Sequence, residues 1–310
     1  MLFWKKWFVP KPFNEGYLPE LDGHQVYFAE YGNPQGEVVL TFHGGPGYWS
    51  RAENAKNFDL RKYRVVMFDQ RGGGKSKPLG ATENNTTQDL LDDAVRLLDY
   101  LKIEGGIILY GSSWGSTLAL LFAEQYPEIV KCLLLSKIFL ADRDCREWEL
   151  KGSGRFYPDI LDAIKGDLPD NSQIPGYYDK MINSGDKALQ SKAVSLYGSY
   201  ERQLGRLNPK IEILEADERS LAANRIYMHY SAEEFMLAED EIMDNIGKIH
   251  HIPTLIVHNR LDFVCPPSNA YKLHKAMQNS KLVIVPDKGH SSKMLSAVNK
   301  KEMAEFLKNV

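Results

Sequence analysis

Three polar residues that lie far apart in the chain have the types and surroundings required for nucleophilic catalysis. The first is Ser113, at the centre of a G-x-S-x-G pattern (Gly-Ser-Ser-Trp-Gly) between a short apolar run and an apolar helix. In such a turn the serine takes a strained backbone conformation, and its hydroxyl stands clear of the sheet. A side chain at either glycine would collide with the adjoining strand or helix, so we expect both Gly111 and Gly115 to be required.

Asp262 and His290 occupy positions from which an acid and a base could serve Ser113. Asp262 comes soon after the predicted strand 253–258, and His290 comes soon after the predicted strand 281–285. A serine hydroxyl is a poor nucleophile at neutral pH unless a base removes its proton, which is the role predicted for His290. Asp262 would fix the tautomer of His290 and stabilise the imidazolium. We therefore predict a catalytic triad of Ser113, Asp262 and His290 that acts through an acyl-enzyme.

A glycine-rich sequence, His-Gly-Gly-Pro-Gly at 43–47, follows the predicted strand 38–42. A loop of this kind exposes backbone N–H groups, which can stabilise a developing negative charge on oxygen. We predict an oxyanion hole formed by the N–H groups of Gly45 and Trp114. Losing one such donor typically costs about 3 kcal/mol of transition-state stabilisation.

Apolar runs that alternate with helical patterns predict the fold that would position these residues. The runs have the length and composition of buried strands, and apolar residues recur at helical spacing between them. This alternation predicts an α/β protein with a mostly parallel, doubly wound sheet. Strands are expected at 24–31, 38–42, 64–69, 107–110, 130–135, 253–258 and 281–285, and helices at 87–101, 117–125 and 268–277.

The segment 141–247 differs in composition from the rest of the chain. It is polar, helix-prone, poor in strand patterns and rich in aromatic residues. A connection of roughly a hundred residues is too long for a simple loop. We therefore predict a helical cap subdomain at 141–247, inserted over the strand ends of an α/β core domain formed by 1–140 and 248–310.

Neither nucleic acid nor a nucleotide is an expected partner of this chain. The 310 residues carry a formal net charge of −3, so there is no basic surplus to attract nucleic acid. The sequence Gly74-Lys75-Ser76 ends like a phosphate-binding loop, but Asp69 stands where that motif needs glycine, and no helical pattern follows. We expect no nucleotide there, and we interpret Asp69 and Arg71 as residues that brace the active-site loops.

Cysteine usage and the N-terminus indicate the compartment. Cys132, Cys145 and Cys265 are odd in number and lack the spacing of metal ligands, as is typical of free thiols in a reducing compartment. We therefore expect a cytoplasmic protein without a bound metal. The N-terminal aromatics, Trp4 and Trp7 among them, are interrupted by lysines and prolines, so we expect neither a membrane span nor membrane contact there. Nothing in the sequence indicates an oligomeric state.

Several blocks of sequence together resemble one family, the proline iminopeptidases, which are serine peptidases of the α/β-hydrolase fold. The order serine, aspartate, histidine along the chain is also the order found in that fold. The resemblance implies release of an N-terminal proline from peptides, with a helical cap over the active site and no metal or cofactor. The matching blocks are 43–47, 69–76 and 111–120, with further matches at 138–139, at Asp262 with 265–267, and at 289–290.

The positions that would bind the substrate depart from this family. The resemblance implies two cap glutamates that bind the free α-ammonium group of the substrate. Glu201, which follows a tyrosine, matches the first position, but the second position is Tyr227, in the sequence Arg-Ile-Tyr. We expect Glu201 to bind the amine, with Glu215 or Glu218 as candidates to replace the missing carboxylate. Phe139 and aromatic residues of the cap, Tyr227 included, are expected to enclose the proline ring.

Two other functions fit the same residues. A carboxylesterase or amide hydrolase would share the triad and would act on small esters or amides without recognising a free amine. A non-catalytic binding protein on this scaffold would have no need of an intact serine, aspartate and histidine. Dehalogenases and epoxide hydrolases use an aspartate where this chain has Ser113, which excludes them. The leading prediction is a serine hydrolase that releases N-terminal proline, or another small residue, from a small peptide.

Overall fold

This computed structural model describes residues 9–204 and 215–310, apart from the side chains at 199 and 201–203. Two features named above therefore lie outside the described residues. The first is the N-terminal aromatics Trp4 and Trp7. The second is the side chain of Glu201; for this residue only the backbone, which is helical, is described.

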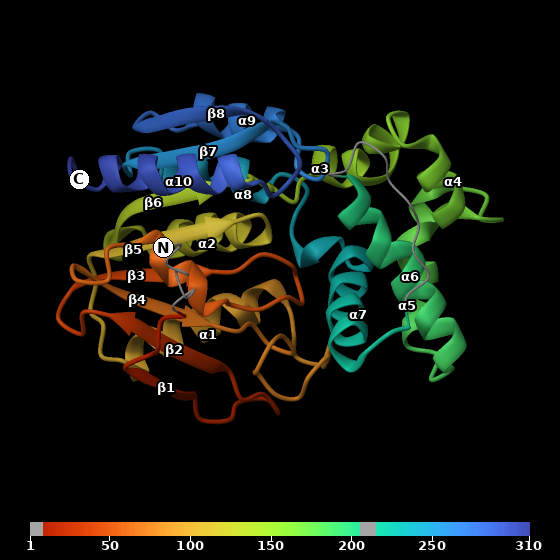
Figure 1. Cartoon of the computed structure of the whole chain (residues 1–310), viewed down its shortest axis with the longest axis horizontal. Helices are drawn as coiled ribbons and strands as arrows, with labels where there is room; N and C mark the ends of the chain where they lie inside the picture. Colours follow the sequence, from red (N-terminus) through yellow and green to blue (C-terminus); the bar gives the residue numbers. More distant parts are fainter. Residues whose placement is uncertain (1–8, 205–214) are drawn as a thin grey trace, which may run out of the picture.

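An eight-stranded sheet forms the centre of the molecule, in the order β1-β2-β4-β3-β5-β6-β7-β8 (Figure 1). β1 pairs with β2, and β2 with β4, in antiparallel orientation, whereas every other neighbouring pair is parallel. The prediction of a mostly parallel α/β sheet is therefore confirmed. The strands are β1 (Asn14–Tyr17), β2 (Tyr27–Gly32), β3 (Glu37–Phe42), β4 (Tyr63–Phe68), β5 (Ile107–Ser112), β6 (Val130–Ser136), β7 (Thr254–Leu261) and β8 (Ser280–Lys288).

Helices cover both faces of the sheet, as a doubly wound fold requires. Successive residues of β5 alternate between two apolar clusters: Ile107 and Leu109 belong to one and Ile108 to the other. The first cluster also contains residues of α1, α2, α8 and α9, and the second contains residues of α10. The central strands are therefore buried on both faces, which explains their continuous apolar runs. These helices are α1 (Thr87–Tyr100), α2 (Trp114–Gln125), α8 (Glu241–Asn245), α9 (Pro267–Ala276) and α10 (Lys293–Phe306).

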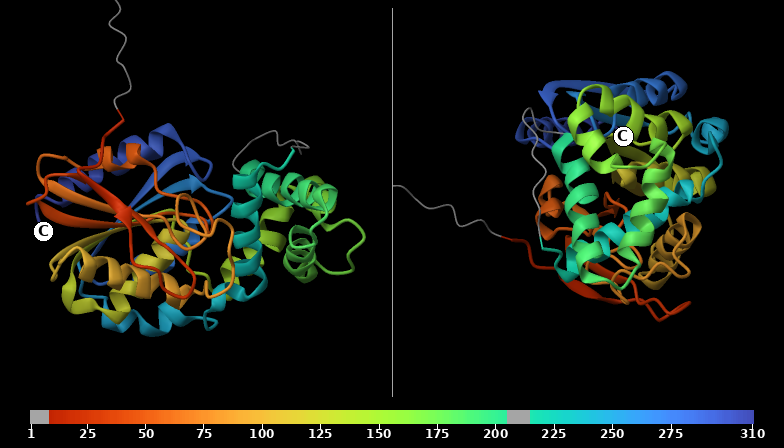
Figure 2. Two further views of the ribbon diagram at one scale, coloured as in Figure 1. Left: turned by 90° about the horizontal axis from the view of Figure 1, so that it is seen from below. Right: turned by 90° about the vertical axis from the view of Figure 1, so that its right-hand side faces the viewer.

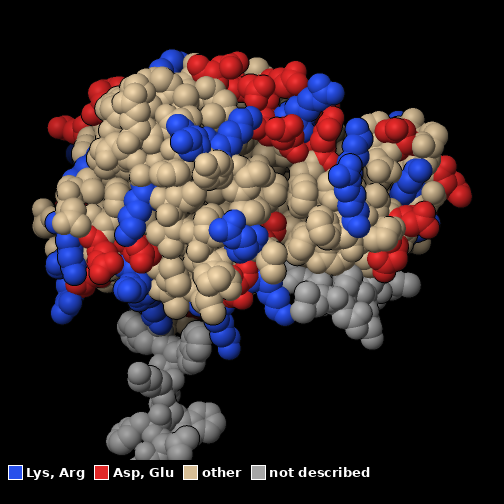
Figure 3. Space-filling view, turned by 90° about the horizontal axis from the view of Figure 1, so that it is seen from above, with Lys and Arg blue, Asp and Glu red and all other residues tan. Residues whose placement is uncertain are grey.

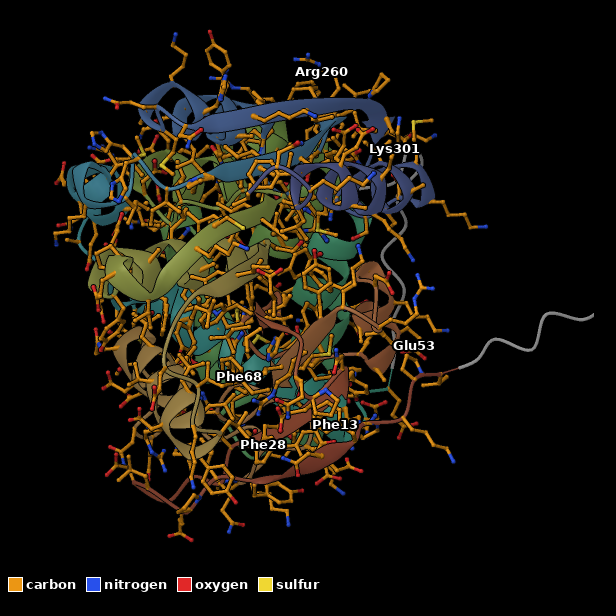
Figure 4. The ribbon with its side chains drawn as sticks, turned by 90° about the vertical axis from the view of Figure 1, so that its left-hand side faces the viewer. Phe13, Phe28, Glu53, Phe68, Arg260 and Lys301 are labelled. Carbon is orange, nitrogen blue, oxygen red and sulfur yellow. The ribbon has the colours of Figure 1, made fainter. Side chains whose placement is uncertain are left out.

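The strand at the antiparallel edge is the one that the sequence pattern misses. β1 is only four residues long, and none of its side chains is buried, so it carries no apolar run. Farther into the sheet, Phe28 of β2 and Phe68 of β4 are paired in register and buried among packed side chains, whereas Arg260 of β7 and Lys301 of α10 are exposed (Figure 4). An edge strand of this kind is held by its backbone pairing rather than by burial of its side chains.

Between β6 and β7 the chain forms a helical insertion, and its described residues contain no strand. The insertion stands beside the sheet, at one end of the strands (Figures 1 and 2). It has an apolar cluster of its own, which includes Ile174, Tyr178 and Tyr197. The indole of Trp148 donates a hydrogen bond to the carbonyl of Phe263, which ties the insertion to the loop after β7. Its helices are α3 (Arg143–Glu147), the π-helical turn η3 (Trp148–Gly152), α4 (Pro158–Lys165), α5 (Ile174–Ile182), α6 (Lys187–Leu204) and α7 (Glu218–Ala232).

On the face shown in Figure 3, acidic and basic side chains are both present and lie among uncharged ones. No helix in the described part of the chain is long and apolar enough to cross a membrane. Within 9–204 and 215–310, no group of three or more His, Cys, Asp or Glu side chains is placed to hold a metal ion.

One buried carboxyl group of the fold makes stability depend on pH. Glu124 of α2 is buried, and its Oε1 has no hydrogen-bond partner. Burial raises the pKa of Glu124 from 4.5 to about 8, although Lys248 opposes this increase. Between these two pH values the native state keeps a proton that the unfolded state has lost. The free energy of unfolding therefore falls as the pH rises through this range.

We expect Glu124→Gln to raise the melting temperature relative to wild type at pH 8 and to change it much less at pH 4.5, because the amide never has to ionise. Thermal denaturation at the two pH values measures this difference. Glu128→Gln, at an exposed position just after α2, is the matched control and should shift the melting temperature equally at both. An equal shift for Glu124→Gln at the two pH values would contradict the assignment.

Candidate active site

Ser113 lies in a sharp turn between β5 and α2, as the sequence pattern predicts. Its backbone has φ 58° and ψ −132°, which is a strained conformation for a residue with a side chain. The N–H of Ser113 donates to the carbonyl of Ser136, and the Ser113 carbonyl accepts from both the N–H and the hydroxyl of Ser116. The turn is therefore held by hydrogen bonds to the neighbouring strand β6 and to the first turn of α2.

The two glycines of the pattern are required for the reason expected. A Cβ atom at Gly111 would lie 2.2 Å from the carbonyl oxygen of Gly115, and one at Gly115 would lie 2.1 Å from the carbonyl oxygen of Phe42. Both contacts are with backbone, which cannot move without displacing β3 or α2. The turn that carries Ser113, called the elbow below, therefore leaves no room for a side chain at either glycine.

The structure brings together the three residues predicted as a triad. Asp262 comes directly after β7, and His290 lies between β8 and α10. The Nδ1–H of His290 donates to Oδ2 of Asp262 at 2.8 Å, and Nε2 lies 2.9 Å from Oγ of Ser113. With Nδ1 carrying the proton, Nε2 is the acceptor for the serine hydroxyl. This arrangement is the one that allows the imidazole to take the serine proton.

Asp262 is kept ionised although it is buried. Burial alone would raise its pKa, but the nearby His290 and the hydrogen bond from it lower the pKa below the usual value. Oδ1 also accepts the N–H groups of Val264 and Cys265, both at 3.0 Å. The carboxylate therefore faces only donors, which fixes the orientation of the imidazole.

Two residues that the sequence analysis did not single out as part of the site hold these loops. Asn259 donates to the carbonyl of Gly289 at 2.7 Å, which holds the residue before His290. His258 accepts the N–H of Ile138 through Nδ1 and donates through Nε2 to a backbone carbonyl. Burial lowers the pKa of His258, so it stays neutral and can both donate and accept. Their polar side chains lie on a buried strand, which is the signal that could have identified them.

The loop that carries Gly45 is also fixed by a buried network. The N–H of Gln70 donates to Nε2 of His43, and the Gln70 side chain donates to the His43 carbonyl and accepts from the indole of Trp114. Burial lowers the pKa of His43, and its Nδ1–H donates to the carbonyl of Gly44. Gly45 and Trp114, the residues predicted to form the oxyanion hole, line one pocket with Ser113.

The interpretation of Asp69 and Arg71 as bracing residues is confirmed. Oδ1 of Asp69 accepts the N–H of Ser50 at 2.7 Å, and Oδ2 accepts the N–H of Lys75 at 2.8 Å. Arg71 is buried and donates to Asp93 at 2.7 Å. The N–H of Lys75, a group of the kind that a phosphate-binding loop offers to a nucleotide, is therefore bonded to Asp69.

Two pockets meet at Ser113. The outer pocket has a volume of about 480 Å³; His290, Lys137 and Arg51 line it, and no acidic residue is found among its described lining residues. The inner pocket is smaller, about 30 Å³, and residues of the helical insertion form part of its wall. The nucleophile therefore lies between a spacious, basic compartment and a small one.

The inner pocket contains Phe139 and Tyr227, two of the three residues predicted to bind substrate. The third, Glu201, has its side chain outside the described part of the structure. Glu215 and Glu218, the candidates for a replacement carboxylate, are exposed, and neither lines the inner pocket.

Glu149 is a pocket residue that the sequence analysis missed. It lies on η3, in the wall of the inner pocket, and Tyr227 donates to its Oε1 at 2.6 Å. Only one sequence signal could have identified it. The pair Trp148-Glu149 has the same aromatic–glutamate form as the pair that identified Glu201.

Comparison with known proteins identifies the relatives of this chain. The profile of the alpha/beta hydrolase fold family matches residues 37–297. The proline iminopeptidase of Arabidopsis thaliana is 38% identical over 290 residues, which cover 91% of this chain and 76% of that protein. A probable proline iminopeptidase of Leptolyngbya boryana is 36% identical (90% and 89% covered), and the proline iminopeptidase of Neisseria meningitidis serogroup A is 37% identical (89% and 90% covered).

Solved structures agree with the fold. An esterase from Exiguobacterium antarcticum superimposes with a TM-score of 0.64 at 19% identity, covering 94% of this chain and 98% of the esterase. A thermophilic esterase from Thermogutta terrifontis gives a TM-score of 0.59 at 21% identity, covering 96% and 98%. At these identities the likeness concerns the fold alone.

We expect Gly115→Ala to lower the free energy of unfolding by about 3 kcal/mol or more, because the added methyl group overlaps a backbone carbonyl that cannot yield locally. Urea denaturation measures this change. Gly176→Ala is the control: Gly176 also lies in a helix, but nothing lies within 4 Å of its added Cβ. The control should be neutral or slightly stabilising. Equal effects of the two substitutions would show that the close approach at the elbow is not as described.

Proposed function

The chain belongs to the α/β-hydrolase fold family and, within it, to the proline iminopeptidases, and on that premise we propose that it is a serine aminopeptidase that releases N-terminal proline from small peptides. The observation that carries the proposal is the hydrogen-bonded series from Asp262 through His290 to Ser113, at 2.8 and 2.9 Å. Family membership supplies the substrate class, and this series supplies the chemistry.

Acylation follows from this geometry. Oγ of Ser113 attacks the carbonyl carbon of the first peptide bond while Nε2 of His290 takes the hydroxyl proton. The negative charge that develops on the carbonyl oxygen is stabilised by the N–H groups of Gly45 and Trp114. The imidazolium then gives its proton to the leaving amine, the C–N bond breaks, and the prolyl group is left as an ester on Ser113.

Deacylation uses the same groups in the same order. His290 removes a proton from a water molecule, which attacks the prolyl ester, and the imidazolium returns the proton to Oγ of Ser113. Asp262, ionised because its neighbours lower its pKa, stabilises the imidazolium in both steps. The products are free proline, the shortened peptide and the original enzyme.

The two pockets suggest how a substrate lies. The acyl residue lies on the side of Ser113 that faces the inner pocket, where Phe139 contributes an aromatic ring to the wall. Phe139 is itself packed edge-on against Phe235, with the ring centroids 5.0 Å apart. The leaving peptide takes the outer pocket, and the helical insertion serves as a cap that limits how far a polypeptide can extend.

The cysteines support the expected cytoplasmic location. Cys132, Cys145 and Cys265 are all buried, and none of the three forms a disulfide. Burial raises the pKa of the Cys132 thiol to about 12 and raises that of Cys145 further. Thiols that are kept protonated and out of contact with solvent have no catalytic part in the proposed reaction.

The proposed function predicts a requirement for a free amine. The enzyme should hydrolyse L-prolyl-β-naphthylamide faster than the alanyl compound and should hydrolyse the N-acetylprolyl compound far more slowly. Initial rates on the three compounds at equal concentration measure this preference. Equal turnover of the free and the acetylated prolyl compounds would contradict the aminopeptidase and favour an amide hydrolase of the same fold.

We expect Asp262→Asn to lower kcat by about 10⁴-fold, because the amide would favour the wrong tautomer of His290. The loss should be the same on L-prolyl-β-naphthylamide and on p-nitrophenyl acetate, since both reactions use the same base. Asp287→Asn, at a position on β8 close to His290 in sequence but outside the triad, is the control. A loss below about tenfold on both substrates would exclude the proposed role of Asp262.

A further inference from the structure

Glu149 brings a carboxylate to the inner pocket beside the nucleophile. It lies on η3, and it is the only acidic side chain among the described residues of the pocket wall, which also includes Ser113. Neither the triad nor the oxyanion hole uses it. A carboxylate in an otherwise largely apolar pocket is costly to bury, so its presence requires a partner.

Among the residues that the structure describes, the side-chain partners of Glu149 are neutral. The hydroxyls of Tyr197 and Tyr227 both donate to Oε1 at 2.6 Å. Oε2 accepts no hydrogen bond from any residue that the structure describes, and no described Lys, Arg or His forms an ion pair with Glu149. Burial raises the pKa of Glu149, while the two phenol groups lower it. The two phenols thus fix one oxygen and leave the charge without a counter-ion.

The backbone of Glu149 is as firmly held as its side chain. The hydroxyls of Ser153 and Tyr200 both donate to its carbonyl oxygen, and Tyr200 is buried. The carboxylate therefore has a fixed position and a fixed orientation in the pocket. A carboxylate held in this way is suited to bind a ligand group at a defined position in the pocket.

The missing counter-ion matches one group of the substrate. In a peptide the α-ammonium group is one carbon away from the first carbonyl, so a carbonyl held at Ser113 brings the ammonium into the inner pocket. An ammonium group paired with a carboxylate in an enclosed site makes a charge-assisted hydrogen bond, which is stronger than a neutral one. In N-terminal proline this group is a secondary ammonium with two N–H donors.

We propose that Glu149 is the carboxylate that binds the substrate's α-ammonium group, in place of the glutamate that the family resemblance places at position 227. The assignment rests on the proposed aminopeptidase function. Tyr227 touches the Glu149 carboxylate directly, so the tips of the two side chains meet at one point in the pocket. The negative charge is supplied from η3, and α7 supplies the phenol that orients it.

The first test removes the charge and keeps the shape. Glu149→Gln should lower kcat/KM for L-prolyl-β-naphthylamide by about 10- to 100-fold, mainly through KM, which is the effect of losing one charge-assisted contact. Hydrolysis of p-nitrophenyl acetate, which has no amine, should be unchanged. Glu147→Gln, at an exposed acid two residues away, is the matched control and should alter neither activity.

The second test moves the charge. Glu149→Tyr should lose activity on the prolyl substrate, and the double variant Glu149→Tyr with Tyr227→Glu should regain at least part of it. The exchange puts a carboxylate and a phenol back at the same contact from opposite sides. Recovery in the double variant distinguishes amine binding from a purely structural role. If the two substitutions only disturbed packing, their losses of activity would add, and the double variant would be less active than either single variant.

Three outcomes would overturn the assignment. If wild type hydrolyses the prolyl substrate and Glu149→Gln leaves its KM unchanged, the proposed function stands and the assignment alone fails. Equal losses on the prolyl substrate and on p-nitrophenyl acetate would give Glu149 a structural role. A wild-type enzyme that hydrolyses no free-amine substrate would overturn the proposed function, and the assignment with it.

Discussion

The backbone at Ser113, with φ 58° and ψ −132°, is the constraint on which the rest of the site depends. A conformation of this kind costs of order 1–3 kcal/mol and persists only where the surroundings over-determine it. Here β5 is paired in parallel with β3 and β6, and α2 packs so closely that only glycine fits at 111 and 115. In this strained conformation, Oγ of Ser113 lies 2.9 Å from Nε2 of His290.

Two carboxylates near this serine, the buried Asp262 and the half-buried Glu149, have contrasting surroundings. Asp262 has a partly exposed imidazole and two backbone N–H groups as partners, so its charge is satisfied within the protein and its pKa is low. Glu149 has two phenols and no cation among its described partners, and its pKa is raised by burial. The first is suited to orient a catalytic base and the second to attract a cation. A site with one satisfied and one unsatisfied carboxylate can therefore separate catalysis from recognition, which a single acid could not do.

The sheet and the triad positions could be predicted from the sequence because each depends on local patterns. Each parallel strand contains an apolar run, and Asp262 and His290 come soon after the ends of β7 and β8. β1 could not be predicted, because its pairing owes nothing to apolar side chains. For Glu149 the sequence offers only the aromatic–glutamate pair with Trp148. Its contacts with Tyr197 and Tyr227 could not be predicted, since both tyrosines come from other helices of the insertion and meet Glu149 through helix packing.

The proposed reaction requires that His290 activates the hydroxyl of Ser113. Reaction with a fluorophosphonate, followed by mass spectrometry of the proteolysed protein, tests this directly, because only an activated serine is phosphonylated at an appreciable rate. We expect a single adduct on the peptide that contains Ser113, and we expect it to be absent from a folded His290→Ala variant. No adduct in the wild-type protein, or an equal adduct in the variant, would contradict the catalytic role assigned to this site.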